Sequence, residues 1–258
     1  MFENLLQLPT PWQILMDPAS IIVISIFLIL MTVEIIFPGR KLPTVKYWRI
    51  RGIFAFIIYF FISSYLPLIW NNYLADYQLF DMTFLGNYWG ALVALLLFEL
   101  GVYVWHRAMH KNNLLWRVFH QMHHSAERVD TYGTFFFSPM DMIGFTFLTS
   151  LAMVWIGGFT VEATIYAIYG ATFLSVIQHT NIKTPQWAGY FFQRPESHSL
   201  HHEKGVHAYN YSDLPLFDIL FGTFRNPKEF AKETGFYDGA SSRIGQMLLF
   251  KDIHANPE

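Results

Sequence analysis

The sequence predicts an all-α integral membrane protein with four to five transmembrane helices and a cytoplasmic helical lobe. Two observations lead to this fold class. Hydrophobic residues make up 53% of the 258 residues and charged residues only 14%, whereas roughly 25% of the residues in an average soluble domain are charged. In addition, all eleven histidines lie after residue 105, so an apolar first part is followed by a second part rich in imidazoles.

The composition also excludes several classes of function. The chain has no cysteine, which rules out disulfide frameworks, thiolate metal sites and cysteine nucleophiles. The net charge of −2 argues against nucleic-acid binding, which normally shows an excess of basic residues. The apolar content is too high for a disordered chain.

Long runs without charge predict the transmembrane helices. A helix needs about 20 mainly apolar residues to cross the bilayer core. Five runs approach or reach that length, and so many would be hard to bury in a soluble core of this size. They comprise residues 19–37, interrupted by Glu34, and residues 52–75, 82–98, 142–161 and 163–182.

The loops between these runs predict the topology. The segment from Pro38 to Arg51 contains five basic residues and no acid, whereas residues 71–81 contain two aspartates and no base. Under the positive-inside rule the first of these loops is cytoplasmic. The third span, residues 87–105, then ends on the cytoplasmic side, and a membrane hairpin over residues 142–178 returns to that side. All eleven histidines are therefore expected at one face of the membrane.

Eight of the histidines form three clusters with helical spacing. Residues three and four apart share a face of a helix, so each cluster can present two or three imidazoles to one region. Imidazole binds iron, zinc, copper and nickel, and one tetrahedral zinc takes at most four protein ligands. The number of histidines therefore predicts a dinuclear, histidine-ligated metal site in the lobe. The candidate ligands are His106, His110, His120, His123, His124, His198, His201 and His202, with His179 near the end of the fifth run.

Other residues are candidates for supporting roles. Glu99 lies within the third span, seven residues before His106, and is a candidate catalytic residue. The alternative is a structural pairing of Glu99 with Tyr103 or with a neighbouring helix. Metal-bound histidines usually donate their second ring N–H to a carboxylate or carbonyl. The candidates for such outer positions are Glu196, Asp213, Asp218 and His207, whereas His254 is expected to take no part.

The motifs that the sequence lacks narrow the chemistry. Arg107, Ala108 and Met109 stand where a zinc protease would carry the glutamate of His-Glu-x-x-His. The Glu-x-x-His pairs of soluble di-iron bundles do not occur in the sequence either. Neutral nitrogen ligation of two metals beside a bilayer instead favours redox chemistry on a lipid.

Three motifs and a tail follow one another along the chain. They read His106-Arg-Ala-Met-His110, His120-Gln-Met-His123-His124 and His198-Ser-Leu-His201-His202, with Asn210-Tyr211 and Gly222-Thr223-Phe224 after them. Together they resemble the histidine boxes of the fatty acid hydroxylase/sterol desaturase superfamily, over about residues 90–225. In some members of that superfamily a tenth histidine lies near the place of His179, where this chain has Ser175 and Lys183. Members that act on ether lipids usually carry an Asn and an Arg near the place of Asp130.

The resemblance implies a membrane-bound non-haem di-iron oxygenase. Such an enzyme hydroxylates or desaturates an unactivated C–H position of a sterol, fatty acyl or ether lipid, using O2 and two electrons. The nine histidines would hold two iron ions, or zinc in isolated protein. The chain would divide into an N-terminal transmembrane region, residues 1–105, and a catalytic region, residues 106–258. A separate electron donor of the cytochrome or ferredoxin/reductase type is expected, because no haem-binding domain accompanies the boxes.

Two other functions stay open on the sequence. One is a zinc-dependent membrane hydrolase on the same scaffold, since imidazole does not select iron over zinc. The other is a metal transporter or metal-binding protein. For each of them the expected location is a bacterial inner membrane or the endoplasmic reticulum, with the histidines on the cytoplasmic side.

Overall fold

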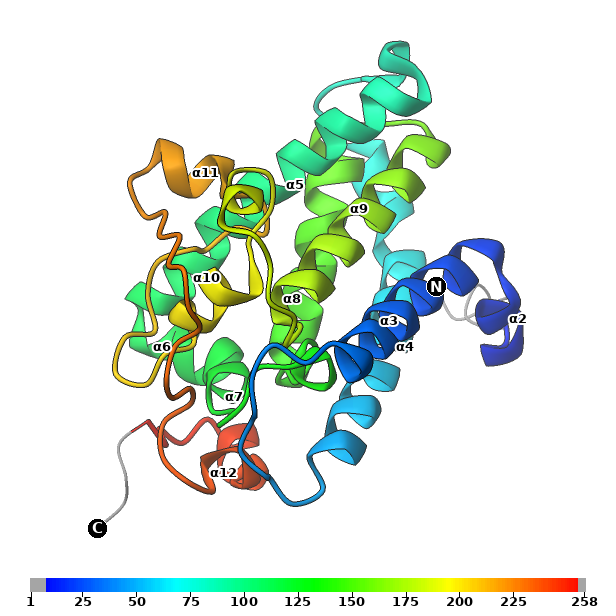
Figure 1. Cartoon of the computed structure of the whole chain (residues 1–258). Helices are drawn as coiled ribbons and strands as arrows, with labels where there is room; N and C mark the ends of the chain where they lie inside the picture. The colour runs from blue at the N-terminus through cyan, green and yellow to red at the C-terminus, as the bar shows by residue number, and fades with distance from the viewer. Residues whose placement is uncertain (1–7, 255–258) are drawn as a thin grey trace.

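The computed structural model describes residues 8–254, and this part of the chain is helical throughout (Figure 1). Within it there is no strand, and the one strand-like feature is an isolated bridge between Glu203 and Thr234. The all-α prediction is therefore confirmed. Residues 1–7 and 255–258, which belong to the ends of the two proposed regions, lie outside the described residues.

Between residues 8 and 254, five helices are long and apolar enough to cross a membrane, which confirms a multi-pass membrane protein. Two of them are extended by short turns: Thr83–Leu85 precedes α5, and a π-helical turn, Leu151–Ile156, continues α8. Within the predicted membrane hairpin, the connection between the two helices covers residues 157–160. The cytoplasmic orientation stays a prediction, as does the division at residue 105, which falls inside α5. The five helices are α3 (Pro18–Ile36), α4 (Trp48–Asp76), α5 (Gly86–Lys111), α8 (Pro139–Ser150) and α9 (Val161–His179).

Polar caps fix where three of these helices begin. The side chains of Asp17, Ser138 and Thr160 each accept a hydrogen bond from a backbone N–H of the first helical turn, which satisfies a donor that has no partner within the helix. Proline follows two of these caps, at the first position of α3 and of α8, where its fixed φ suits a helix start. The spans therefore begin at defined residues although their interiors are uniformly apolar.

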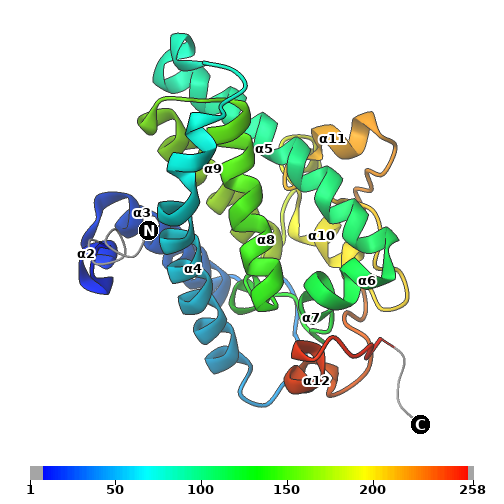
Figure 2. The same cartoon turned by 180° about the vertical axis from the view of Figure 1, so that it is seen from behind.

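The long helices pack side by side. Contacts join α5 to α9, α4 to α8 and α3 to α9, and Figures 1 and 2 show them as one bundle. Gly90 lets α5 approach α9 closely, because a Cβ there would lie 3.0 Å from the Cβ of Ala163. The short helices α6 (Asn113–Leu115), α7 (Gln121–His124) and α12 (Ile244–Leu248) lie at one end of the bundle. Two other short helices lie along its side, with α10 (Pro195–His201) in contact with α9 and α11 (Pro215–Leu220) in contact with α5. The short helix α2 (Pro11–Met16) precedes α3.

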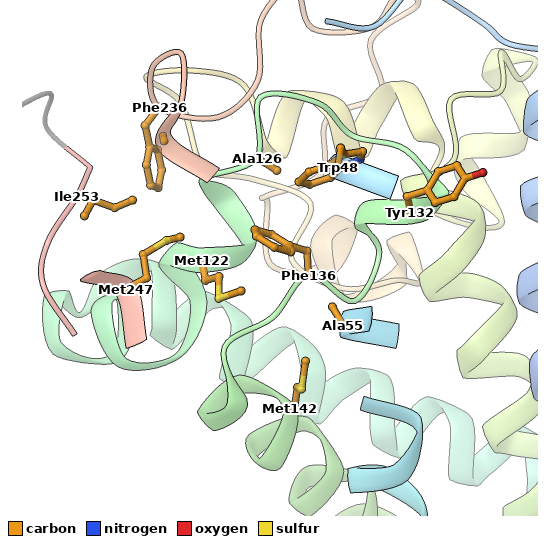
Figure 3. Close-up of a cluster of buried hydrophobic side chains, with 11 residues drawn as sticks. Trp48, Ala55, Met122, Ala126, Tyr132, Phe136, Met142, Phe236, Met247 and Ile253 are labelled. Carbon is orange, nitrogen blue, oxygen red and sulfur yellow. The ribbon is translucent and has the colours of Figure 1, made fainter. Parts of the chain in front are cut away.

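A buried apolar cluster ties the short helices to the start of α4 (Figure 3). Trp48 lies at its centre against Phe136, with ring centroids 5.1 Å apart, and its indole N–H donates to Asp130 at 2.8 Å. Gly52 lets α4 approach the turn around Tyr132 closely, because a Cβ at that position would lie 2.1 Å from the carbonyl oxygen of Tyr132. Asp130, singled out from the sequence, is thus a buried anchor of the lobe on α4.

Candidate metal centre

The structure brings all nine predicted ligands together, in two groups. Within each group, one potential ligand atom from every histidine lies within 4.8 Å of all the others. The five-histidine group consists of His106, His110, His120, His124 and His201. The four-histidine group consists of His123, His179, His198 and His202.

Helical spacing decides how the clusters divide between the groups. Residues four apart stay together, as His120 with His124 and His198 with His202, whereas the intervening His123 and His201 each join the opposite group. At 3.6 residues per turn, side chains four apart differ by about 40° around the helix, and those three apart by about 60° in the other direction. Helices α7 and α10 therefore lie between the two groups and supply both. The expectation that each triplet serves one region was wrong, because these helices present their histidines on both sides.

In the five-histidine group, the Nδ1 atom of every ring has an outer partner. An Nδ1–H that donates to a carbonyl or carboxylate leaves Nε2 with a free lone pair, so these contacts aim the Nε2 atoms at a common centre. The partners are the Tyr211 carbonyl for His106 (2.7 Å), the His207 carbonyl for His110 (2.8 Å), Asp141 Oδ2 for His120 (2.7 Å), the Tyr209 carbonyl for His201 (2.7 Å) and His207 Nδ1 for His124 (3.1 Å).

Two of these carbonyls come from a loop with left-handed backbone. The φ angles are 39° at His207, 70° at Tyr209 and 50° at Asn210, a region that costs a non-glycine residue roughly 1–2 kcal/mol. The Asn210 amide holds this loop, since its Nδ2 donates to the carbonyls of Ser197 (2.9 Å) and Arg225 (3.0 Å) and its Oδ1 accepts from the Arg225 N–H. Strained backbone of this kind is typical of functional sites.

The four-histidine group is arranged differently. Its Nε2 atoms face one another in a chain, with 3.1 Å between His123 and His179, 2.9 Å between His179 and His198, and 3.1 Å between His198 and His202. Among the residues that the structure describes, only His179 of this group has an outer acceptor, the Ser175 carbonyl at 2.6 Å from its Nδ1. The Nδ1 atoms of the other three rings are buried and have no partner within the described part of the chain.

The donor atoms fit two metal ions. Buried polar atoms in proteins normally have partners, yet the Nε2 atoms of His110, His124 and His201 have none among residues 8–254. These atoms converge with the other ring nitrogens of their group, and a bound cation would satisfy them together. A set made only of imidazoles suits iron, zinc, copper or nickel.

The protonation state of the lobe histidines also fits metal binding. A ring must be neutral to offer a lone pair. Burial lowers the pKa of each of these histidines well below its ordinary value, and nearby imidazoles lower it further. This applies to the pKa of His120, His123, His124, His198, His201 and His202.

Three of the acids proposed as outer partners do not reach a histidine ring. Glu196 accepts hydrogen bonds from the N–H and hydroxyl of Thr184, both at 2.8 Å. Asp213 accepts from Ser175 and Gln178, and Asp218 accepts from two successive backbone N–H groups of the tail. The predicted outer role of these acids was wrong, because each one holds a segment of backbone or a neighbouring polar side chain instead.

The acid that does reach a ring is Asp141, which the sequence did not single out. It is fully buried near the start of α8, and its Oδ2 accepts from His120. The sequence feature that could have indicated this role is the position of Asp141, an acid in the first turn of the fourth span, at the end of the span that lies nearest the histidines. His207 takes the outer position proposed for it, beside His124, and His254 is exposed and belongs to neither group.

Glu99 is buried but belongs to neither group. Its Oε2 accepts from the hydroxyl of Ser212 (2.8 Å) and from the N–H groups of Asp213 (3.0 Å) and Leu214 (3.1 Å). The alternative pairing with Tyr103 is not found in the described structure, where the phenol contacts Thr223 and Arg107 instead. Glu99 therefore anchors the segment that follows Tyr211, whose carbonyl orients His106.

Both groups face one small cavity of about 60 Å³. His106 and His120 line it from the five-histidine group, and His123, His179 and His198 line it from the four-histidine group. The rest of the wall is largely apolar and aromatic, with Phe98, Val102, Phe135, Phe137 and Phe145. A hydrocarbon segment in this cavity would lie beside both groups and away from water.

Comparison with known proteins agrees with the motifs. The family model described as fatty acid hydroxylase matches residues 91–223, a range that includes all nine histidines. An ornithine lipid hydroxylase of Rhizobium tropici is 29% identical over 53% of this chain and 42% of its own length. A cholesterol 25-hydroxylase-like protein of Danio rerio is 27% identical over 67% of the chain and 69% of its own length. A sphinganine C4-monooxygenase of Arabidopsis thaliana is 23% identical over 52% of this chain and 53% of its own length.

No solved structure matches the chain significantly. The match to the ornithine lipid hydroxylase spans less than half of that protein. The family model, in contrast, covers more than half of this chain and extends from within α5 into the tail motif, as far as Thr223. The chain therefore belongs to the fatty acid hydroxylase family.

Proposed function

We propose that the protein is a di-iron oxygenase that hydroxylates or desaturates an unactivated C–H position of a membrane lipid, using O2 and two electrons. The observation that carries this proposal is the pair of all-histidine groups that share one small cavity at the end of a membrane helix bundle. The relatives support it, since their names describe hydroxylases and a monooxygenase of lipids.

The nine histidines would hold two iron ions, which would supply the O2-dependent oxidation of the lipid. The protein's own side chains prepare the site for this chemistry. Asp141 and the carbonyls of the 207–210 loop fix the tautomers of the five-histidine group. The aromatic wall of the cavity excludes water and positions the hydrocarbon. Glu99 acts as a positioning residue, through the segment that it anchors beside Tyr211.

The alternatives receive less support. A transporter would place its ligands near the middle of the bilayer on interrupted helices, whereas these histidines lie at the ends of the spans and on the short helices beyond them. A zinc-dependent hydrolase would use the same ligands. The bound metal and the incorporation of oxygen into lipid distinguish it from an oxygenase. The site is proposed to face the cytoplasm and to receive electrons from a separate redox protein.

The test compares two ligand variants with a histidine that lies outside both groups. His201→Ala removes a ligand of the five-histidine group, His123→Ala removes one of the four-histidine group, and His254→Ala is the control. Cells that express each form are grown under isotopically labelled O2, and their lipids and the metal content of the purified protein are measured. We expect wild type and the control to bind iron and to produce labelled or newly unsaturated lipid.

Both ligand variants should lose iron and oxidised product. Unchanged product in both variants would contradict the proposed site. Zinc in the wild-type protein, together with neither oxygen incorporation nor new unsaturation, would favour the hydrolase.

A further inference from the structure

We propose that α11 and the turn Gln186–Tyr190 form a membrane anchor that inserts into one leaflet beside α5 and steadies the tail of the metal centre. The partner of this surface is the lipid bilayer itself. The proposal concerns the part of the chain that follows the last span, and it does not depend on the reaction that the site performs. It rests on an exposed apolar face, on the position of that face beside α5 and on its lack of charge.

Two segments that are distant in the sequence expose large apolar side chains on one surface. Helix α11 contacts the turn Gln186–Tyr190. The exposed positions on α11 are three and four residues apart and so share one side of the helix, whereas Phe217 and Asp218 are buried. Soluble proteins rarely expose large contiguous apolar patches, so we expect this face to be covered. The anchor face consists of Trp187, Phe191, Leu216, Ile219, Leu220 and Phe221.

The position of α11 beside α5 indicates what covers the anchor face. Phe221 stacks on Tyr103, with 4.9 Å between ring centroids, and Phe217 belongs to the buried cluster around Tyr103. Tyr103 lies eight residues before the end of α5 at Lys111, which corresponds to about 12 Å along the helix axis. Figures 1 and 2 show α11 beside the middle part of α5, away from α6. Helix α11 therefore lies against a stretch of α5 that belongs to its membrane span.

The anchor face continues the lipid-facing surface of α5. Before Arg107, the only charged residue of α5 is Glu99, which is fully buried. Val104, next to Tyr103, is exposed in the same way as the outward side chains of the other spans. Arg107 donates to the Tyr103 hydroxyl at 2.7 Å, which marks the polar border of this surface. The bilayer that surrounds α5 at this level would therefore also meet α11.

The composition of the two segments fits a lipid surface. Residues 186–191 and 215–221 contain a single charged residue, Asp218, and its carboxylate is fully buried. Trp187 and Tyr190 are both exposed, and these residue types are enriched where a membrane meets water. A partner that recognised charge would find none on this face, whereas acyl chains would bury its apolar side chains.

The anchor is linked to the five-histidine group through Asp218. This carboxylate accepts hydrogen bonds from the N–H groups of Tyr211 and Ser212, both at 2.9 Å. The Tyr211 carbonyl in turn orients His106, at 2.7 Å from its Nδ1. One short helix thus presents apolar side chains to lipid and a carboxylate to the tail, so seating α11 in the bilayer would also fix the carbonyl that orients His106.

Fluorescence quenching measures whether the anchor face meets lipid. The sequence has no cysteine, so each single-cysteine variant carries one fluorophore at a known position. Leu220→Cys and Trp187→Cys probe the face, the exposed Ile29→Cys on α3 is the lipid reference, and the exposed Lys232→Cys is the water reference. Each protein is placed in phosphatidylcholine nanodiscs with or without nitroxide-labelled phosphatidylcholine, and iodide is added to the water.

The probes at positions 220 and 187 should be quenched by the nitroxide lipid as strongly as the probe at position 29, and should resist iodide. Quenching like that at position 232 would place the face in water and overturn the proposal. Protection from both quenchers would mean that a second copy of the chain or another protein covers the face, which would also overturn it. The measurement needs neither metal nor substrate, so its result is independent of the proposed function.

A matched pair of charge substitutions tests the link to the metal centre. Leu220→Asp places a carboxylate in the lipid contact, whereas Leu249→Asp places one on a similarly exposed leucine directly after α12. Leu220→Asp should remove the lipid quenching of the probe at position 187. It should also weaken metal binding at the five-histidine group by up to about 10–100-fold, the loss typical when an outer partner of a ligand is disturbed. Leu249→Asp should change neither property. Equal metal binding by the two variants would overturn the role of the anchor at the metal centre.

Discussion

The two histidine groups differ in how firmly their rings are held. In the five-histidine group every Nδ1 atom has an outer partner, whereas in the four-histidine group only the Nδ1 of His179 has one within the described structure. An outer hydrogen bond fixes both the tautomer and the orientation of a ligating ring. The first group is therefore preorganised to receive a metal ion, whereas the second would depend on a bound ion for its order.

This difference follows from where the groups lie. The five-histidine group lies against the 207–210 loop and the start of α8, which offer carbonyls and the carboxylate of Asp141. In the four-histidine group no carbonyl or carboxylate among the described residues meets the Nδ1 atoms of His123, His198 and His202, and the His123 ring lies against Phe137, with 4.6 Å between ring centroids. A site with fewer fixed ligands can adjust its geometry during a reaction but holds its metal less tightly.

The largest effect should come from removing one ligand from either group. His201 and His202 are adjacent at the end of α10, are both almost fully buried, and belong to different groups. We expect His201→Ala to lose the metal of the five-histidine group and His202→Ala to lose the metal of the four-histidine group. In each variant the metal content should fall from two ions per chain toward one. Metal analysis measures this, and loss of lipid oxidation should accompany both. If either variant retained two metals, the division into two groups would be refuted.

A chelator should then distinguish the groups in the wild-type protein. Because three rings of the four-histidine group lack an outer hydrogen bond, its metal should leave first and the other metal later. Metal content is followed over time in wild type and in His202→Ala, which should show the slow phase alone. A single phase of release in wild type would mean that the outer hydrogen bonds do not control retention.

A smaller effect is expected from Asp141→Asn, which keeps the shape of the side chain but replaces the carboxyl group beside His120 with an amide. Loss of an outer carboxylate typically weakens metal binding by about 10–100-fold, and we expect this at the five-histidine group only. Competitive metal titration gives the two affinities. The exposed Asp238→Asn is the matched control, and an equal loss at both groups would indicate a general disturbance of the fold.

The smallest effect on the metals should follow from changes at Asn210, which acts through the loop that it holds. Asn210→Gly permits the left-handed backbone but removes three hydrogen bonds, at about 1–3 kcal/mol of stability. Asn210→Ala adds strain of roughly 1–2 kcal/mol at the positive φ. The denaturation temperature in detergent should be highest for wild type, lower for the glycine variant and lowest for the alanine variant. Equal stability of the two variants would argue against backbone strain there.

Much of the architecture could be predicted from the sequence because it depends on local pattern. Uncharged runs indicate spans whatever their neighbours, and the structure has a long helix for each of the five. The nine histidines were identified from their spacing and from a family resemblance, and the structure brings together that same set. The orientation of the bundle in the membrane and the identity of the metal remain predictions.

What the sequence could not provide depends on tertiary contacts. The histidines of α7 and α10 divide between the two groups because both helices lie between them, and the position of a helix in the fold is not visible in its sequence. The carbonyls of His207 and Tyr209 act through backbone conformation, which side-chain patterns do not record. Asp141 and Glu196 are both acids in the first turn of a helix, and only the fold shows that one meets a ring and the other Thr184.

The lengths of two helices have a consequence for the lipid bilayer itself. Helix α9 has 19 residues and ends on His179, so at about 28 Å it barely matches a hydrocarbon core of about 30 Å. Helix α5 has 26 residues and carries His106 and His110 in its last turns, so it can shift or tilt in a thicker bilayer and still reach the lobe. Hydrophobic mismatch would therefore act on the four-histidine group first, which makes the thickness of the host membrane a determinant of metal-site geometry.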